Sequence, residues 1–377
     1  MLYYVGYMDS LQSKYPHFVS PAGSSKMKYI TDVLYECGID VHIISMARPL
    51  LPGVNFCKSE IIEISKGQDL FYLPFITSDI VFFRKISVIC QMFYLLLYIL
   101  FKVHRNDIVT VYHSLSYASI MILLKKIIGF KLILEVEEIY SDVKNVMYIN
   151  SLAEKKLFSL ADAFFFPTEM LDEKVNNRKK PSLIIYGNYN ASEIVSEKMK
   201  DGKIHVVYSG TFNERKGGVF SAINAAKYLN SNFHIHITGY GTENEIENVK
   251  KNINDVLQGN SCSLSYDGFI SEMEFNSYIQ KFNIGLCTQN PDDILSSSCF
   301  PSKILLYMSN GLTVLSSKAP AVVNSRLASK IFFYEMKDPV FIAQRIKEIP
   351  LDVDSRLVVS GLDLQCKKQM KKFLSLI

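Results

Sequence analysis

The chain has 377 residues, of which 49% are apolar and 21% are charged, and its formal net charge is +4. A chain of this length and apolar content fills more than one hydrophobic core, so we expect two domains and no extensive disorder. The small positive charge gives no indication of a nucleic-acid partner, but it is compatible with an anionic ligand or an anionic membrane surface. The seven cysteines form no CxxC pair and no Cys/His ligand cluster, which suggests free thiols in a reducing cytoplasm.

The N-terminal residues follow a strand, loop, helix, strand pattern. Apolar strands at residues 1–6 and 41–45 flank a polar loop and an amphipathic helix that runs from about residue 27 to Gly38. This βαβ unit predicts a parallel sheet covered by helices. Gly23, in the loop, is either a simple turn glycine or a point where backbone approaches a ligand or the second domain. Residues 1–6 lack the features of a secretory signal, so we interpret them as a buried strand.

Residues 86–101 are nearly all apolar and have basic residues on both sides. At 16 residues the segment is short for a bilayer span, and we interpret it as a buried core helix. A helix that lies in a membrane interface is the alternative, because aromatic residues and basic flanks suit that position.

Three ionisable residues come at the ends of two further apolar strands. The strand at residues 107–112 ends at His113, and the strand at residues 131–136 ends in Glu137 and Glu138. Such strands are typical of a parallel sheet with both faces covered, in which ligands bind at the carboxyl ends. We therefore predict that His113, Glu137 and Glu138 take part in substrate chemistry, with a buried structural role as the alternative for each.

The apolar pattern stops around residues 186–190 and restarts at residues 204–208, where a second series of strands and helices begins. We place the domain boundary in this gap, with a first domain at residues 1–187 and a second at residues 188–355. Two such domains predict a cleft between them. An amphipathic, lysine-bearing tail follows at residues 356–377.

Glycines, two cationic residues and one aromatic residue lie at the predicted strand ends of the second domain. The residues concerned are Gly210, Arg215, Lys216, Gly239, Gly241, Gly268 and Phe269. Each glycine alone is more often part of a simple turn, but their joint position at the carboxyl ends of one sheet predicts an anion site. Neither the Walker spacing nor the dinucleotide fingerprint is present.

The segment at residues 299–315 has the pattern of a helix with marked ends, followed by a strand. Pro301 suits the first helical position, and Gly311 suits a left-handed C-terminal cap. The opening turn would present backbone N–H groups beside the Ser302 hydroxyl and the Lys303 ammonium, so we predict a phosphate site there. An ordinary crossover helix with an incidental lysine is the alternative.

With these motifs in this order, the sequence resembles the GT-B glycosyltransferases, in particular the family-4 enzymes that build bacterial surface polysaccharides from nucleotide sugars. The resemblance is strongest over residues 204–318, where Ser-Gly…Lys-Gly, Gly-x-Gly, Asp-Gly-Phe, Phe-Pro-Ser-Lys and Tyr-Met-x-x-Gly-x-x-Val follow one another. It implies an α/β GT-B fold, in which two Rossmann-like parallel-sheet domains face an interdomain cleft. It also implies that the helix at residues 356–377 packs back on the first domain.

The resemblance assigns roles to several of these residues. Lys216 resembles the lysine that contacts the donor diphosphate, and Ser302 with Lys303 resembles the phosphate cradle at a helix start. The main chain at Gly239, Gly241 and residues 268–270 corresponds to the ribose and base pocket of the family.

Two positions depart from the family pattern. Gly210-Thr211 stands where the family usually has Gly-Arg, so the second diphosphate cation would come from Arg215 or Lys303. Ser298 and Leu306 occupy the positions of the family's Glu-x7-Glu carboxylates, one of which usually binds the ribose. A weakened nucleotide site, or a subunit without activity, therefore stays open as an interpretation.

The resemblance implies transfer of a sugar from a nucleotide-diphosphate sugar to a glycan or lipid-linked acceptor in capsule or O-antigen synthesis. Cations and helix N–H groups would stabilise the leaving diphosphate, so we expect neither a metal nor a cofactor. Asp352-Val353-Asp354 is interpreted as a surface turn. We expect a cytoplasmic protein, with a peripheral contact to the cytoplasmic face of the inner membrane as an option, and no nucleic-acid partner.

Two alternatives stay open. One is a non-catalytic GT-B-shaped subunit that binds a nucleotide sugar beside an active transferase. The other is a GT-B epimerase that acts on the donor alone.

Overall fold

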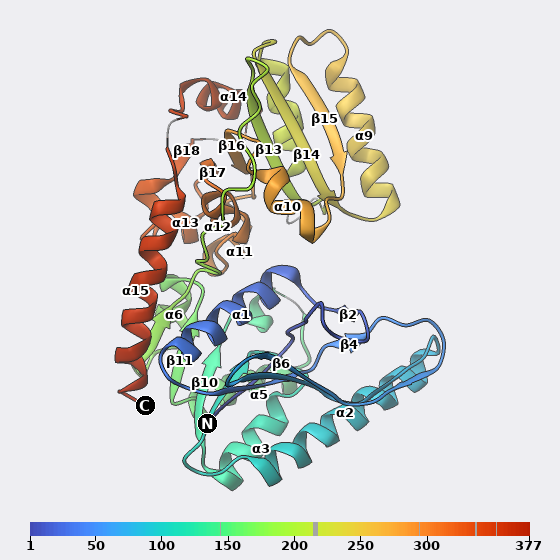
Figure 1. Ribbon diagram of the computed structural model, residues 1–377, viewed down its shortest axis with the longest axis vertical. Coiled ribbons are helices and arrows are strands. Elements are labelled where there is room, and N and C mark those ends of the chain that lie inside the picture. Colours follow the sequence, from blue (N-terminus) through green and yellow to red (C-terminus); the bar gives the residue numbers. More distant parts are fainter. Residues whose placement is uncertain (144, 214–217, 294, 336–337, 352) are drawn as a thin grey trace. The chain divides into compact units, whose positions relative to one another are not determined.

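The computed structural model describes residues 1–143, 145–213, 218–293, 295–335, 338–351 and 353–377. The chain divides into two compact units (Figure 1). Unit 1 comprises Met1–Asn188 and Gln365–Ile377, and unit 2 comprises Tyr189–Leu364. The last helix, α15 (Arg356–Leu374), therefore begins in unit 2 and ends in unit 1.

Unit 1 is built on an eight-stranded sheet with the order β12-β11-β10-β9-β1-β3-β7-β6. Its strands are β1 (Leu2–Gly6), β3 (Val41–Ser45), β6 (Glu60–Ser65), β7 (Gln68–Tyr72), β9 (Ile108–Tyr112), β10 (Lys131–Glu135), β11 (Ala163–Phe166) and β12 (Ser182–Ile184). All neighbouring strands are parallel except β6 and β7. Strand β1 lies between β3 and β9, so the strand order reverses its direction between β1 and β9. Sheets of this kind bind ligands at that switch point.

Helices cover both faces of this sheet, with α1 on one face and α2 and α3 on the other (Figure 1). The helices of unit 1 are α1 (Pro21–Glu36), α2 (Val81–Lys102), α3 (Ala118–Ile128), α4 (Tyr140–Val143), α5 (Tyr148–Leu160) and α6 (Glu169–Val175). Two short antiparallel pairs complete the unit, β2 (His17–Phe18) with β4 (Arg48–Pro49) and β5 (Asn55–Cys57) with β8 (Phe75–Thr77).

Helix α1 begins earlier than the sequence pattern predicted. Ser20 is its N-cap and accepts a hydrogen bond from the N–H of Gly23, and Pro21 occupies the first helical position. A serine followed by proline is a favourable helix start, and it outweighs the helix-weakening effect of Gly23. Gly23 lies in the first turn of α1 and not in a loop, and a Cβ there would lie 3.4 Å from the Tyr112 hydroxyl, an ordinary van der Waals distance.

Helix α2 is longer and more exposed than predicted. The interpretation as a buried core helix was wrong, because only 28% of its most apolar window is buried. Its buried residues, Ser87, Gln91, Met92, Leu95 and Ile99, form a narrow stripe at helical spacing. Among the described residues, α2 is the one helix long and apolar enough to cross a membrane by length and composition.

Unit 2 contains a six-stranded, fully parallel sheet with the order β15-β14-β13-β16-β17-β18. Its strands are β13 (Ile204–Thr211), β14 (Phe233–Tyr240), β15 (Ser263–Gly268), β16 (Ile284–Cys287), β17 (Thr313–Ser317) and β18 (Phe332–Tyr334). This is the 3-2-1-4-5-6 order of the Rossmann sheet, with its switch point between β13 and β16.

Helices of unit 2 also lie on both faces of the sheet. They are α8 (Val219–Ala225), η1 (Ala226–Tyr228), α9 (Glu243–Leu257), α10 (Glu272–Ile279), α11 (Leu295–Ser298), α12 (Ser302–Ser309), α13 (Pro320–Val323), η2 (Ala328–Lys330) and α14 (Pro339–Glu348). Side chains of β13 and β14 alternate between two layers: Val206, Tyr208, Ile235 and Ile237 join the core under α8, α9 and α14.

Helix α12 ends as the sequence predicted. Gly311 has φ +75°, its N–H donates to the Met308 carbonyl at 3.1 Å, and the Leu312 N–H donates to the Tyr307 carbonyl at 3.0 Å. This pair of bonds is a Schellman cap, for which glycine is preferred. At the other end, Pro301 is the N-cap instead of the first helical residue, one position from the prediction.

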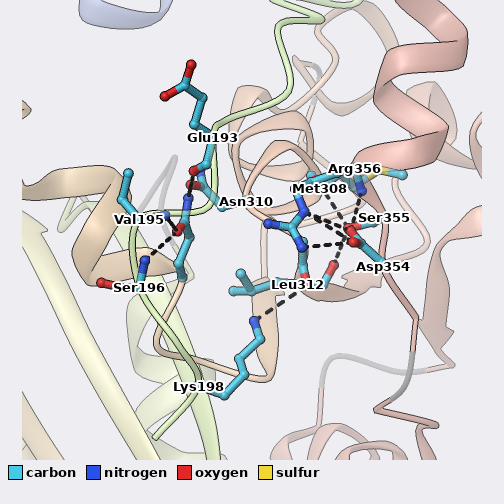
Figure 2. Close-up of polar contacts among 12 residues, drawn as sticks. Glu193, Val195, Ser196, Lys198, Met308, Asn310, Leu312, Asp354, Ser355 and Arg356 are labelled. Atoms are coloured by element: carbon cyan, nitrogen blue, oxygen red, sulfur yellow. Dashed lines mark hydrogen bonds and ion pairs between the residues drawn. The ribbon is translucent and has the colours of Figure 1, made fainter.

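The segment after the unit boundary is tied to the end of α12 by one amide side chain (Figure 2). Gln280 is 2% exposed, and its Oε1 accepts from the N–H groups of Val195 and Ser196 at 2.8 and 3.1 Å. Its Nε2 donates to the Glu193 carbonyl at 2.6 Å and to Asn310 Oδ1 at 3.2 Å. Both groups of this buried amide are therefore satisfied.

The residue before α15 is hydrogen-bonded to the C-terminal end of α12. Ser355 Oγ lies 3.0 Å from the Met308 carbonyl and 2.7 Å from the Leu312 carbonyl, while Arg356 pairs with Asp354 (Figure 2). Both segments that lead out of unit 2 are thus fixed to the C-terminal end of α12, whose N-terminal end carries Ser302 and Lys303.

Candidate functional site

Glycines form the carboxyl-terminal rim of the unit 2 sheet. Gly210 and Gly239 lie opposite each other in the β13–β14 register, with φ of +156° and +146°. A Cβ at Gly239 would lie 1.8 Å from the Gly210 carbonyl oxygen, so no side chain fits there. These two strand ends therefore expose main chain where an anionic ligand can approach closely.

Lys303 reaches this rim from the first turn of α12. Its Nζ lies 4.1 Å from the centroid of the buried Tyr208 ring, and a Cβ at Gly210 would lie 3.0 Å from that nitrogen. A cation over an aromatic face is attracted by the ring, which fixes the ammonium group beside Gly210. The fold thus brings together Gly210 and Lys303, two residues that the sequence analysis placed in one site.

Tyr307, one helical turn after Lys303, fixes α12 to the sheet. Its hydroxyl accepts a hydrogen bond from the Ser209 N–H at 2.8 Å and lies 3.3 Å from the Leu286 carbonyl. Its ring covers Gly285, where a Cβ would lie 2.2 Å from a ring atom. The helix therefore sits across the switch point between β13 and β16.

The rim continues over β14 and β15 with two exposed aromatic rings. Gly268, with φ +81°, ends β15, and Phe269 after it is 70% exposed. The Tyr240 ring, 49% exposed, meets the Phe269 ring edge to face at 6.3 Å. Gly241 follows, and a Cβ there would lie 2.9 Å from Glu245 Oε2. Exposed rings beside bare main chain offer a surface for a nucleotide base.

Of the other predicted donor-site residues, Ser302 is exposed in the first turn of α12. Arg215 and Lys216 lie outside the described residues.

In unit 1, the corresponding rim carries buried ionisable side chains. Glu135, which ends β10, is fully buried and accepts a hydrogen bond from the Tyr4 hydroxyl. The buried Lys26 donates to Glu137, and its Nζ lies 3.9 Å from Glu135 Oε1. Burial raises the pKa of Glu135 well above the usual carboxyl range, and Lys26 opposes that shift.

His113 is 2% exposed at the end of β9. Its Nε2 lies 3.4 Å from Oε1 of the fully buried Glu154, which accepts hydrogen bonds from the N–H groups of Tyr140 and Ser141 at 2.8 and 3.2 Å. Burial lowers the pKa of His113 to about 4, so the ring is neutral at pH 7. Glu137 and Glu138 are both half-buried in the turn that follows β10.

A cavity of about 790 Å³ opens within unit 1, and its lining includes Tyr7, which follows β1, and Ser114, which lies shortly after β9. Its lining includes the hydroxyl groups of Ser20, Tyr112, Ser114 and Tyr140. Two arginines, Arg48 and Arg84, also line it. Tyr112 and Ser114 stand on either side of His113 in sequence, so the cavity wall carries the neighbours of that histidine rather than the histidine.

Several features of these rims were not predicted from the sequence. Tyr208 and Tyr240 have a recognisable signal, since each is an aromatic residue within one or two positions of a rim glycine. The contact between Lys26 and Glu135 has no such local signal, because only the pairing of strands and the packing of α1 bring the two side chains together.

A further group could hold a metal ion. Among the described residues, His205, His234 and His236 place one ligand atom each within 4.8 Å of the others. The sequence analysis found no such cluster because its members lie on two strands and do not follow a short ligand spacing.

No protein-family model and no curated protein matches this sequence. Solved structures do match. The chain is similar to Anabaena HepE in complex with UDP, with a TM-score of 0.66, 10% identity and 100% of both chains covered. It is similar to trehalose-6-phosphate synthase from E. coli bound with UDP-2-fluoro glucose, with a TM-score of 0.66 and 10% identity. The match covers 100% of this chain and 98% of that one.

It is also similar to the lipopolysaccharide outer core galactosyltransferase WaaB in its apo form, with a TM-score of 0.54, 14% identity and coverage of 99% and 95%. At these identities the similarity is one of fold. The predicted fold class is confirmed: the chain has an α/β GT-B fold with two Rossmann-like parallel-sheet domains.

Proposed function

We propose that this chain is a glycosyltransferase that moves a sugar from a nucleotide-diphosphate sugar to a glycan or lipid-linked acceptor, as the family-4 enzymes of bacterial surface polysaccharide synthesis do. The observation that carries the proposal is the Lys303 ammonium, held over Tyr208 beside Gly210 at the rim of a Rossmann sheet. The UDP in HepE and the UDP-2-fluoro glucose in the E. coli protein support a nucleotide sugar as the donor.

In this proposal unit 2 binds the donor. As the acceptor hydroxyl attacks the anomeric carbon, the bond to the diphosphate breaks and negative charge grows on the leaving phosphate. Lys303 and the N–H groups at the start of α12 stabilise that charge from fixed positions. Charge stabilisation by these groups makes the reaction independent of a divalent metal. Tyr240 and Phe269 contact the base.

Unit 1 binds the acceptor in its cavity. The serine and tyrosine hydroxyls of the lining suit a sugar, and Arg48 and Arg84 suit a phosphate of a lipid-linked acceptor. Glu137, half-buried and bonded to Lys26, orients or deprotonates the acceptor hydroxyl. His113, after β9, and Glu138, after β10, support the same rim, with His113 acting through Tyr140.

The apolar face of α2 contacts the membrane that holds such an acceptor. Phe82, Phe83, Ile89, Phe93 and Phe101 are each more than half exposed on this helix. Arg84 and Lys102 lie near its two ends, where they attract anionic headgroups. Arg84 also lines the cavity, so the helix begins beside the place proposed for the acceptor. In this proposal α2 contacts the cytoplasmic face of the inner membrane.

The central test is the Lys303→Met variant, which keeps the side-chain stem and removes the charge. We expect kcat/KM for the preferred donor to fall about 10²–10³-fold, the usual cost of one preorganised charge-stabilising donor. Purified protein is screened with radiolabelled UDP- and GDP-sugars, with and without a lipid-linked acceptor and in the presence of a chelator. Lys330→Ala, at an exposed lysine of η2, is the matched control and keeps wild-type activity.

Three outcomes contradict the proposal. Wild-type transfer by Lys303→Met would remove the donor site from this rim. Binding of a nucleotide sugar without transfer would favour the non-catalytic subunit, and a changed sugar nucleotide in the absence of acceptor would favour the epimerase.

The membrane contact has its own test. We expect the double variant Phe82→Ser, Phe83→Ser to lose most of its co-sedimentation with vesicles that contain phosphatidylglycerol, because both exposed rings leave the interface. Met273→Ser, at a methionine of unit 2 that is 89% exposed, is the control for lost surface hydrophobicity and keeps binding. Equal binding of the two variants would place the contact elsewhere.

A further inference from the structure

Three histidines cluster on one face of the unit 2 sheet, away from the glycine rim. His234 and His236 are two residues apart on β14 and so share a face, and His205 on β13 lies opposite His234 in the register. His205 and Gly210 stand near opposite ends of β13, roughly 16 Å apart at the rise of a β-strand. The cluster is therefore separate from the proposed donor site.

Two carboxylates fix the protons on two of these rings. Asp201 Oδ1 lies 2.8 Å from His205 Nε2, and Asp267 Oδ2 lies 2.7 Å from His236 Nδ1. A carboxylate can only accept, so each of these two ring nitrogens carries a hydrogen. In a neutral imidazole the other nitrogen then has a lone pair. His205 Nδ1 and His236 Nε2 lie 3.0 Å apart and face each other as two acceptors.

Two facing lone pairs repel unless a cation lies between them. A tetrahedral metal ion with bonds of about 2.0–2.1 Å to nitrogen separates its ligand atoms by roughly 3.3 Å, close to the separation of the two facing nitrogens. A carboxylate on the far nitrogen of a ligating histidine is the usual arrangement around zinc, because it fixes the ring and raises its basicity. Here two histidines have that arrangement.

The third ring is a suitable further ligand. His234 is half-buried and stacks on His236 with ring centroids 3.8 Å apart, and its Nε2 lies 3.1 Å from Ser265 Oγ. One of its ring nitrogens lies within 4.8 Å of the ligand atoms of the other two histidines. Nearby Lys203 donates to Ser263 Oγ at 2.8 Å.

We propose that His205, His234 and His236 bind one divalent transition-metal ion of the zinc type, with Asp201 and Asp267 orienting two of the ligands. Neutral imidazoles select zinc, cobalt, nickel or copper over magnesium and calcium. Solvent completes the coordination on the side of His234. Any proton held between His205 and His236 is released when the metal binds. The ion joins β13 to β14 near their N-terminal ends and stabilises the start of unit 2.

The test is direct binding and does not depend on glycosyl transfer. The full chain is stripped with EDTA, exchanged into chelator-free buffer, and titrated with Co²⁺ and then with Zn²⁺. We expect one equivalent of Co²⁺ with the visible absorption of a nitrogen-ligated site, displacement by Zn²⁺, and a higher melting temperature with metal.

Variants separate this site from adventitious binding. His234→Asn changes the half-exposed ligand, so the fold is kept, and affinity falls about 100-fold or more. Asp201→Asn leaves all three ligands in place and costs about 10–100-fold. His104→Asn, at a histidine of unit 1 whose side chain is 81% exposed, binds as the wild type does.

The proposal is overturned if the wild type binds less than one equivalent of Co²⁺ or Zn²⁺, or if His234→Asn and His104→Asn bind equally well. It is also overturned if nitrogen-detected NMR shows an unchanged proton between His205 and His236 after Zn²⁺ is added.

Discussion

The carboxyl-terminal rims of the two sheets share a topology but differ in chemistry. In unit 2 the strand ends carry Gly210, Gly239 and Gly268, so that the rim consists of main chain with Lys303 above it. In unit 1 the strand ends carry side chains that are buried and hydrogen-bonded, such as Glu135 with Tyr4. A bare rim lets a large anion reach backbone hydrogens, whereas a filled rim orients smaller groups through its side chains.

Electrostatics follows the same division. Burial raises the pKa of Glu135 and of Tyr112 and lowers that of His113, so these three buried groups favour their uncharged forms. The unit 2 rim instead presents the positive charge of Lys303 beside Gly210. In the proposed function, Lys303 stabilises the leaving group and Glu137, beside the buried groups of unit 1, acts on the acceptor hydroxyl.

The largest effect is expected from placing a side chain on the bare rim. Gly239→Ala puts a Cβ 1.8 Å from the Gly210 carbonyl oxygen in a backbone conformation with positive φ, so β13 and β14 must separate. We expect a loss of about 3–5 kcal/mol in the free energy of unfolding, together with the loss of nucleotide binding. Urea unfolding followed by far-UV circular dichroism measures the first, and calorimetric titration with UDP the second.

Gly259→Ala is the matched control, because Gly259 also has positive φ, +80°, but nothing lies within 4 Å of a Cβ there. We expect Gly259→Ala to lower the free energy of unfolding by only about 1–2 kcal/mol, the cost of the left-handed backbone conformation for alanine. If the two variants lose equal stability, close packing of the β13–β14 rim is not what requires glycine.

An intermediate effect is expected from the filled rim, as a dependence of stability on pH. Because burial raises the pKa of Glu135, the folded protein keeps a proton that the unfolded chain releases above pH about 4.3. Stability therefore falls as pH rises. Buried His113 has the opposite sign: its lowered pKa makes stability rise with pH up to about 6.5, the unfolded value, and adds nothing above it.

Above pH 6.5 only the carboxyl contribution of this pair remains. We expect the wild type to lose up to about 1.4 kcal/mol per pH unit between pH 6.5 and the raised pKa of Glu135, about 8, and Glu135→Gln, a neutral isostere, to show a flatter profile. Urea unfolding at several pH values measures both slopes. Glu247→Gln, at an exposed position of α9, keeps the wild-type slope. A wild-type slope in Glu135→Gln would mean that the titrating group is a different one.

Much of the fold could be predicted from local sequence. Pro301 and Gly311 delimit α12 because helix starts and left-handed caps have residue preferences of their own, and continuous apolar runs identify the strands of both parallel sheets. The side-chain environment of α2 could not be predicted, because hydropathy measures composition and does not say which neighbours cover a helix. Its burial depends on packing that only the folded chain defines.

The candidate sites divide in the same way. The glycines and Lys303 have local signatures, since strand ends and helix starts bind anions with nearby residues. The contact between Lys26 and Glu135 and the cluster of His205 with His234 and His236 arise from strand register and helix packing over long sequence separations. No spacing rule covers such contacts, and they become visible only in three dimensions.

The smallest effect is expected at the aromatic edge of the bare rim. The Tyr240 ring, half-exposed and in edge-to-face contact with Phe269, offers a face on which a nucleotide base can stack. Tyr240→Ala should weaken UDP binding by about 1 kcal/mol, roughly fivefold, the lower end of what base stacking on an aromatic ring contributes. Calorimetric titration measures this loss of affinity, with Tyr228→Ala, at a 46% exposed tyrosine of η1, as the control.

Because the proposed diphosphate contacts at Lys303 are untouched, inorganic pyrophosphate should bind both variants equally. A loss of pyrophosphate binding in Tyr240→Ala would show that this edge supports the rim itself, and the contrast between a bare rim and a filled one would then have to include its aromatic side chains.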